Sequence, residues 1–226
     1  MKLRGLYAIT PEDIGRAAPA GSAHVMAATI DRVVAAAMDR VVAAVASGAL
    51  CALQYRNKAG SQAQRLAEAR ELARQCRRFN VPLIINDDLE LALEVDAAGL
   101  HLGQEDGDLA GARARLPGRI LGASCYNQPE LARRAVAAGA DYVAFGSVFP
   151  SPTKPGAARA PLALFSLPLA VPKVAIGGIT LQNAPQVVAA GADCVAVITD
   201  LFEAPDVAQR ARDFAKIFHH ENAHRP

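Results

Sequence analysis

The sequence predicts a single (β/α)8 barrel domain, the TIM-barrel architecture, spanning residues 1–226. Four segments repeat one pattern, in which an Ala-rich helix end is followed by a glycine and then by a strand, with the glycines at positions 48, 99, 139 and 191. A glycine just past a helix permits the left-handed conformation that ends it. The gaps between these glycines each leave room for two strand–helix units, and the intervening strands are expected at Leu6–Thr10, Leu83–Asn86, Ile120–Ser124 and Lys173–Ile176.

Strands that alternate with helices imply parallel pairing with helical crossovers. Eight such units in 226 residues average about 28 residues each, which fits a slightly compact barrel. A doubly wound open sheet is the alternative architecture, and the regular repetition of every element favours the barrel over it.

Apolar periodicity and end signals predict several helices. Gln62–Phe79 places small and apolar side chains on one side, and Pro129 lies in the first turn of the next clear helix. Pro205–Phe218 is expected to form the last helix, before a disordered tail at 219–226.

The first strand–helix unit is longer than the others. Pro11–Ala28 is rich in Ala, Gly and Pro, and we expect it to be an extended loop that forms a mobile cover on the catalytic face. The pairs Asp31-Arg32 and Asp39-Arg40 repeat after eight residues, a little over two helical turns, so both are expected on nearby faces of one long first helix.

Composition limits the function classes. A hydrophobic content of 52% permits a sizeable core, and a net charge of only +2 argues against a nucleic-acid partner. The chain has no run of 18 apolar residues and its start lacks a signal-peptide core, so we expect no membrane partner and a cytoplasmic location. The cysteines lack CxxC spacing and are interpreted as reduced core thiols; they are Cys51, Cys76, Cys125 and Cys194.

Polar side chains follow the predicted strands where active sites of such barrels lie. Asn86-Asp87-Asp88 comes directly after one buried strand, and Asp106 follows the next. Two neighbouring carboxylates suit Mg²⁺ held largely through water and phosphate oxygens. Asp88 is better interpreted as a helix N-cap, and a cap role for Asp87 remains the alternative to its role as a ligand.

Two anion sites are predicted. Arg56, Lys58 and Lys154 supply cations beside the carboxylates, although the first two could instead be a solvated pair. Gly177-Gly178 after the seventh predicted strand lets backbone N–H groups approach a phosphate, although many turns use two glycines. Neither His nor Cys occupies a clear nucleophile position: His101 is interpreted as a packed core residue, and Cys125 has no histidine near it in sequence.

Five ordered motifs, each at a predicted strand end, resemble the thiamine phosphate synthase family over nearly the whole chain. They are Gln54-x-Arg56-x-Lys58, Asn86-Asp87-Asp88, His101-x-Gly103-Gln104-Glu105-Asp106, Ser151-Pro152-Thr153-Lys154 and Ile176-Gly177-Gly178-Ile179. The resemblance implies a (β/α)8 barrel transferase that joins hydroxymethylpyrimidine diphosphate to a thiazole phosphate and releases diphosphate.

The resemblance also implies residue roles. Asp87 and Asp106 would hold Mg²⁺, and the catalytic residues would be Arg56, Lys58, Ser124 and Lys154. Ser124 would contact the pyrimidine, and Ser151, which stands where the family usually has Thr, keeps the hydroxyl for the thiazole phosphate. The candidate substrate-binding residues are Gln54, Tyr55, Arg56, Asn57, Lys58, Asn86, Ser124, Ser151, Thr153, Lys154, Gly177, Gly178, Ile198 and Thr199.

Three other functions are weighed against this one. A related thiazole tautomerase would have an active site built around a histidine, and Ala123-Ser124-Cys125-Tyr126 contains none. A Schiff-base aldolase would need a lysine inside the barrel; the nearest candidates are Lys154 and Lys173, and Lys173 begins its strand at the wrong end. A non-catalytic phosphate-ligand binder is disfavoured by the intact acids. The expected partners are small-molecule substrates, and a homo-oligomer is possible without an interface signature.

Overall fold

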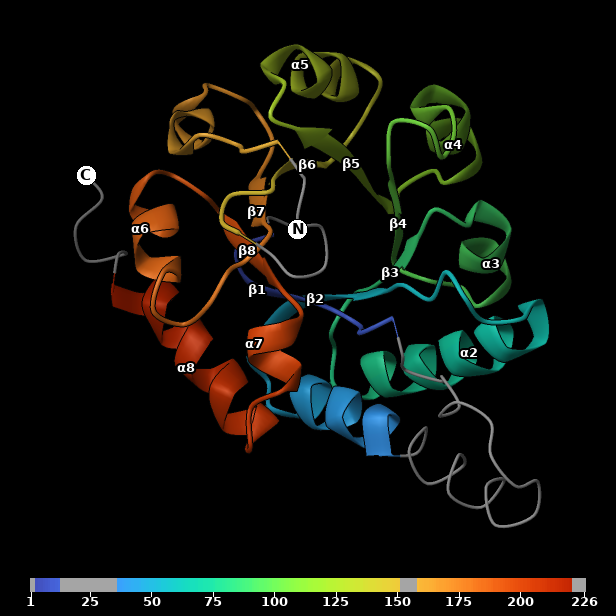
Figure 1. Ribbon diagram of the computed structural model, residues 1–226. Coiled ribbons are helices and arrows are strands. Elements are labelled where there is room, and N and C mark those ends of the chain that lie inside the picture. Colours follow the sequence, from blue (N-terminus) through green and yellow to red (C-terminus); the bar gives the residue numbers. More distant parts are fainter. Residues whose placement is uncertain (1–2, 13–35, 151–157, 221–226) are drawn as a thin grey trace.

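The computed structural model describes residues 3–12, 36–150 and 158–220, and within them eight parallel strands close into a barrel with helices around it (Figure 1). Each strand pairs with its neighbours in chain order, and β8 pairs with β1. The strands are β1 (Gly5–Ile9), β2 (Leu50–Tyr55), β3 (Leu83–Asn86), β4 (Gly99–Leu102), β5 (Ile120–Tyr126), β6 (Tyr142–Gly146), β7 (Lys173–Ile176) and β8 (Cys194–Val197). The barrel prediction is therefore confirmed.

Strand boundaries agree closely with the sequence prediction. β3 and β7 have the predicted bounds, and β1 is shifted by one residue. β5 is longer than predicted, because the register against β6 shifts between Ser124 and Tyr126. This irregularity carries the strand two residues further and brings Tyr126, with a positive φ of 52°, to the rim of the barrel.

The helices on the outside of the barrel follow the strands, and the first described residues after the gap, 36–46, are helical. The predicted loop beyond Glu12, the Asp31-Arg32 pair and the tail from 221 lie outside the described residues. The other helices are α2 (Gln62–Arg78), α3 (Leu89–Glu94), α4 (Leu109–Arg115), α5 (Pro129–Ala137), α6 (Ala184–Ala189), α7 (Thr199–Phe202) and α8 (Val207–His220).

One described connection and the bounds of the last helix differ from the sequence prediction. In the described part of the segment between β6 and β7 there is a short 3₁₀ helix, η1 (Leu162–Ser166), and no α-helix. Pro161 and Pro168 flank it, and prolines cannot donate the backbone hydrogen bonds of a longer helix. The last helix, α8, begins two residues after the predicted start and continues through His220, so His219 belongs to the helix and not to a tail.

Three of the four repeated glycines play the predicted role, and Gly99 does not. Gly48, Gly139 and Gly191 have φ values of 70°, 93° and 107°. Before β4 the positive φ belongs to Asp96 instead, at 50°. Gly99 is the first residue of β4, where a Cβ atom would meet Ile120 O at 2.2 Å, so its small size serves the close approach of two strands.

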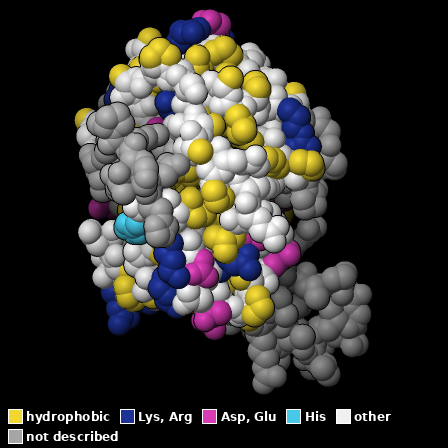
Figure 2. Space-filling model, turned by 90° about the vertical axis from the view of Figure 1, so that its left-hand side faces the viewer, with side chains coloured by type: hydrophobic (Ala, Val, Ile, Leu, Met, Phe, Trp, Pro, Cys, Tyr) yellow, Lys and Arg dark blue, Asp and Glu magenta, His cyan; other side chains and the backbone are white. Residues whose placement is uncertain are grey.

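The core has two layers. Alternate strand residues fill the barrel interior, including Tyr7, Ile84, Tyr142 and Val174, and the outward-facing residues pack against the helices. All four cysteines are free thiols, as predicted. In the described residues, no helix has the length and apolarity needed to span a bilayer. On the face in Figure 2, acidic and basic side chains are interspersed and neither charge forms a continuous stripe.

Candidate active site

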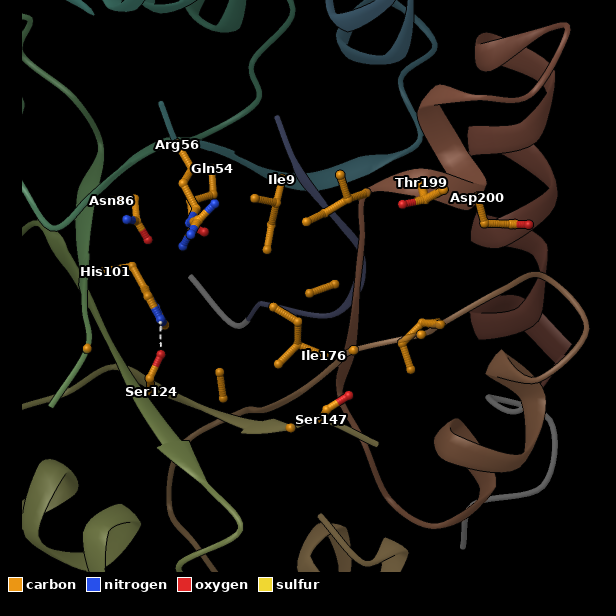
Figure 3. A pocket seen from close by; sticks show the side chains of 18 of the residues that line it. Ile9, Gln54, Arg56, Asn86, His101, Ser124, Ser147, Ile176, Thr199 and Asp200 are labelled. Carbon is orange, nitrogen blue, oxygen red and sulfur yellow. Dashed lines mark hydrogen bonds between the residues drawn. The ribbon is translucent and has the colours of Figure 1, made fainter. Parts of the chain in front are cut away.

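A cavity of about 870 Å³ opens at the carboxyl ends of the strands. Side chains from opposite sides of the barrel converge on it (Figure 3). It brings together most of the predicted site residues that the structure describes: Gln54, Arg56, Lys58, Asn86, Asp87, Asp106, Ser124, Gly177, Gly178, Ile198 and Thr199. Ser151, Thr153 and Lys154 lie outside the described residues, so their assignment stays a prediction.

The end of β2 divides its side chains between two faces. Gln54, Arg56 and Lys58 line the cavity, as the two-residue period of a strand requires. Tyr55 lies on the outer face, 2% exposed, and donates to Glu68 Oε2 at 2.7 Å. Asn57 donates to the same oxygen at 3.0 Å.

The prediction that Tyr55 and Asn57 belong to the substrate site is therefore corrected, because the structure places both side chains away from the large cavity. Asn57 Oδ1 accepts from the backbone N–H groups of Ala59 and Gly60, at 3.2 and 2.8 Å. The buried Glu68 of α2 thus anchors the loop that carries Lys58. These two residues support the strand end and do not face a ligand in the large cavity.

Arg56 is held by its backbone as well as by its side chain. Its N–H donates to Thr10 Oγ1 at 2.9 Å, and the Thr10 hydroxyl donates to Arg56 O at 3.1 Å. The guanidinium forms an ion pair with Glu12. With Thr10 buried at the end of β1, the cation is fixed over the cavity rather than solvated as an independent surface charge.

Asp87 adopts a left-handed backbone conformation, with φ of 63°. Its N–H donates to His101 O at 2.9 Å, and its Oδ2 accepts from Asn86 Nδ2 at 2.6 Å. Lys58 Nζ lies 3.1 Å from the same oxygen. A positive φ in a non-glycine residue is uncommon, and here it turns the carboxylate into the cavity at the end of β3.

Asp88 has a different role from its neighbour. Its Oδ1 accepts from Leu91 N at 2.9 Å, which caps α3, and its Oδ2 lies 3.1 Å from Arg65 Nη1. The interpretation of Asp88 as an N-cap is confirmed.

Asp106 approaches Asp87 from the loop after β4. Burial raises the pKa of Asp106, and the Asp87 carboxylate raises it further through repulsion and a side-chain hydrogen bond. Gly103 is what permits this position, because a Cβ atom there would meet Asp106 Oδ2 at 2.2 Å. Two acids whose charges repel one another across a short gap suit a divalent cation, so the donor set fits Mg²⁺.

Within the described ranges, no group of three or more His, Cys, Asp or Glu side chains is arranged to hold a metal ion.

Ser124 and His101 meet on the side of the cavity formed by β4 and β5. His101 Nε2 lies 2.9 Å from Ser124 Oγ (Figure 3). Burial lowers the pKa of His101 to about 4, so the imidazole is neutral at pH 7. The prediction of a packed core histidine is confirmed, and the structure adds that its ring also borders the cavity.

Cys125 points away from the cavity and is fully buried in the outer core. Burial raises the pKa of its thiol to about 12. It therefore lacks the thiolate character of a nucleophile, in agreement with the sequence interpretation.

The opposite side of the cavity is built from backbone. Gly177 and Gly178 have φ values of 99° and 62°. A Cβ atom at Gly178 would meet Pro150 O at 2.2 Å, and one at Gly177 would meet Ser147 Oγ at 2.3 Å. Asn183 fixes the turn by donating from Nδ2 to Gly178 O at 2.9 Å. Both positions therefore require glycine, beyond what an ordinary two-glycine turn needs.

Several lining residues were not among the predicted site residues, and some of them carry polar or charged groups that border the site. Ser147 and Asp200 line the glycine side of the cavity, and Asp200 Oδ2 accepts from Arg210 Nη1 at 2.6 Å. Arg210 comes from α8 and Tyr126 from the irregular end of β5. Asp200 could have been found from its place directly after the predicted eighth strand, whereas Arg210 carries no local signal.

The closed parallel barrel, with charged side chains gathered in a cavity at the carboxyl ends of its strands, defines an enzyme of the (β/α)8 class. The family model described as thiamine monophosphate synthase matches residues 24–201. The chain therefore belongs to the thiamine monophosphate synthase family, a family of transferases.

Individual relatives agree over almost the full length. Thiamine-phosphate synthase of Aromatoleum aromaticum is 50% identical over 221 residues, covering 96% of this chain and 97% of that protein. The Methylobacillus flagellatus protein of the same name is also 50% identical, with 96% of each chain covered. The solved structure of thiamine phosphate pyrophosphorylase from Pyrococcus furiosus superposes with a TM-score of 0.78 at 29% identity, covering 97% of both chains.

Proposed function

We propose that the chain condenses hydroxymethylpyrimidine diphosphate with a thiazole phosphate, giving thiamine phosphate and diphosphate. One observation carries this proposal: a single cavity holds paired carboxylates with cations on one side and a two-glycine turn on the other. The first side suits a diphosphate with Mg²⁺, and the second suits a phosphate bound by backbone N–H groups. A cavity with two separate anion sites is what a reaction between two phosphorylated substrates needs.

In the proposed reaction, the bond between the pyrimidine methylene carbon and the diphosphate oxygen breaks, and the electron pair leaves with diphosphate. The electron-rich aminopyrimidine supports the positive charge on the methylene carbon. The thiazole nitrogen then donates its lone pair to form the new carbon–nitrogen bond. This reaction needs no covalent bond between the enzyme and a substrate, which accords with the buried state of Cys125.

The protein side chains would position the reactants and stabilise the departing charge. Arg56 and Lys58 are placed to neutralise the leaving diphosphate, and Asn86 adds an amide donor beside them. Asp87 and Asp106 would hold Mg²⁺, which when bound neutralises negative charge that builds up on the leaving group. Ser124 would contact the pyrimidine. Ser151, Thr153 and Lys154 are assigned from the sequence alone.

The Gly177-Gly178 turn, with Ile198 and Thr199 beside it, would hold the thiazole phosphate so that its ring nitrogen faces the pyrimidine methylene. Holding two reactants in one cavity removes most of the entropic cost of their encounter. We propose cytoplasmic action on small phosphorylated substrates. Homo-oligomerisation stays a prediction.

The test is turnover with both organic substrates. Purified protein is mixed with pyrimidine diphosphate, thiazole phosphate and Mg²⁺, and released diphosphate and thiamine phosphate are measured together. We expect equal amounts of both products, and neither when one organic substrate is omitted. Diphosphate release without thiazole phosphate would indicate a hydrolase, and binding of both substrates without turnover would indicate a non-catalytic binder; either result overturns the proposal.

A further inference from the structure

A continuous hydrogen-bonded chain runs through the barrel interior and joins two residues that line the cavity. Gln54 Nε2 donates to the Tyr7 hydroxyl at 3.2 Å, and the Tyr7 and Tyr142 hydroxyls lie 2.8 Å apart. The Tyr142 hydroxyl lies 2.9 Å from His101 Nδ1, and His101 Nε2 lies 2.9 Å from Ser124 Oγ. The five residues come from five different strands.

The middle of this hydrogen-bonded chain is buried, and of its three residues only His101 borders the cavity. Tyr7 and Tyr142 are each 1% exposed, and His101 is 7% exposed. The Tyr142 ring stacks on His101 with centroids 5.5 Å apart. Gly122 makes room for that ring, because a Cβ atom there would meet Tyr142 Cζ at 2.0 Å. Buried polar groups must satisfy one another, so each hydroxyl orientation depends on that of its neighbour.

The Gln54 amide sets the direction of the whole chain. Because Gln54 donates to Tyr7, the Tyr7 proton is free to donate to Tyr142, and the Tyr142 proton then points at His101 Nδ1. A neutral imidazole that accepts at Nδ1 carries its hydrogen on Nε2. His101 therefore donates to Ser124 Oγ, and the Ser124 proton is left to point into the cavity.

We propose that Tyr7, Tyr142 and His101 are positioning residues that hold Ser124 as a hydrogen-bond donor to the pyrimidine ring and so select an aminopyrimidine over its oxo analogue. This inference rests on the proposed function, in which Ser124 contacts the pyrimidine. The ring nitrogen beside the amino group of an aminopyrimidine is an acceptor, which matches the Ser124 donor. In the oxo analogue that nitrogen carries a hydrogen, so two donors would face each other.

The test compares two unreactive competitors, the amino and oxo forms of hydroxymethylpyrimidine monophosphate. Neither can release diphosphate, so their inhibition constants report binding alone. Tyr142→Phe keeps the ring and deletes the donor to His101 Nδ1, which allows Nε2 to accept from Ser124. We expect the wild type to favour the amino form and Tyr142→Phe to lower that preference about tenfold, the value of one well-placed hydrogen bond.

Tyr55→Phe is the matched control. It deletes the hydroxyl of another buried tyrosine, 2% exposed, and that hydroxyl donates to Glu68 outside the chain of hydrogen bonds. We expect it to keep the wild-type ratio of inhibition constants. Should Tyr142→Phe fail to fold by circular dichroism, Tyr7→Phe interrupts the same chain one residue earlier and is also expected to lower the ratio. If Tyr142→Phe, or Tyr7→Phe in its place, folds and its ratio stays within about twofold of the wild-type ratio, the inference is overturned.

A double-mutant cycle separates positioning from a merely structural effect. If Tyr142 acts through Ser124, then Tyr142→Phe has no further effect on the ratio in a Ser124→Ala background. Multiplicative effects of the two substitutions would contradict the inference. Failure of the proposed function is recognised separately, because the wild type would then give no thiamine phosphate. If only this inference fails, the wild type still turns over and Tyr142→Phe keeps the wild-type ratio of inhibition constants.

Discussion

Lys58 Nζ lies 3.1 Å from Asp87 Oδ2 at the carboxyl ends of two adjacent strands, and the Asp106 carboxyl is within hydrogen-bonding reach of Asp87. One cation therefore balances only part of the charge of two acids. Mg²⁺ would complete that balance, while Lys58 would be released toward the leaving diphosphate. The arrangement would link metal binding to the placement of the Lys58 cation, for which we propose a catalytic role.

Asp87→Ala is expected to lower Mg²⁺-dependent turnover by about 10²–10³-fold, because it removes both a proposed metal ligand and the partner of Lys58. The measurement is the initial rate of diphosphate release as a function of Mg²⁺ concentration. A saturation curve identical to that of the wild type would remove Asp87 from the metal site.

Asp88→Ala is the matched control for that experiment, because it removes a carboxylate from the adjacent position. Asp88 caps α3, so its loss is expected to cost about 1 kcal/mol of unfolding free energy. The Mg²⁺ dependence of the rate should remain that of the wild type. A loss of Mg²⁺ dependence in this variant would contradict the division of roles between the two aspartates.

The raised pKa of Asp106 predicts a pH effect on the metal-free protein. The folded state holds the Asp106 proton to a higher pH than the unfolded chain, whose ordinary value is 3.8. Within that window the folded state binds more protons, so the free energy of unfolding falls as pH rises from about 4 through the raised pKa. Mg²⁺ competes with this proton, so its binding strengthens over the same pH range.

Thermal melts of the wild type and of Asp106→Asn, with and without Mg²⁺, measure this linkage. We expect Mg²⁺ to raise the melting temperature of the wild type more at about pH 8 than at about pH 4. Asp106→Asn should lose most of this difference. Equal stabilisation by Mg²⁺ at both pH values would show that the metal does not displace the proton from the Asp106 carboxyl.

Much of the site could be predicted from sequence because strand ends in a parallel barrel meet at one rim. Asn86, Asp87 and Gly178 each follow a short apolar run directly, so local pattern and topology place them together. The same pattern also placed Tyr55 and Asn57 in the site, where the structure does not place them. The two-residue period of a strand sends alternate side chains outward, where both donate to the buried Glu68.

Other features depend on contacts between distant segments. Arg210 reaches the cavity from the last helix only because α8 packs beside α7, and its spacing from Asp200 gives no hint of a shared site. Tyr126 reaches the rim through an irregular register that no composition signal marks. Gly99 resembled a helix stop because both roles need glycine, and the close approach of Ile120 on the next strand decides between them.

The buried carboxylate of Glu68 is expected to support both stability and diphosphate binding. It accepts from Tyr55 and Asn57 on one oxygen and from Gln64 Nε2 on the other, at 2.9 Å. Glu68→Ala leaves these donors without their acceptor, at a cost of about 1–3 kcal/mol. Because Asn57 shapes the loop that carries Lys58, the KM for pyrimidine diphosphate should also rise severalfold.

Urea denaturation and steady-state kinetics check this expectation, with Glu71→Ala as the control. Glu71 lies one turn further along α2, where it pairs with Arg74 at the surface and accepts from Gln75 Nε2 at 2.8 Å. Its loss should cost about 0.5–1 kcal/mol of unfolding free energy, less than the loss of Glu68, and should leave both KM values unaltered. If Glu68→Ala is as mild as Glu71→Ala, the loop is held by other contacts.

Gly178→Ala is expected to damage the thiazole phosphate site selectively. Its φ of 62° disfavours any side chain, and the added Cβ would meet Pro150 O at 2.2 Å, so the turn must shift. A displacement of this size in a binding turn predicts a KM for thiazole phosphate higher by about tenfold to a hundredfold. The KM for pyrimidine diphosphate should change much less.

Gly118→Ala separates steric from conformational effects, because Gly118 has a φ of 74° and a Cβ atom added there would have no neighbouring atom within 4 Å. That control should lose about 1 kcal/mol of stability from its backbone strain alone while keeping both KM values, and a matching change in the two variants would place the effect in general destabilisation rather than in the phosphate turn.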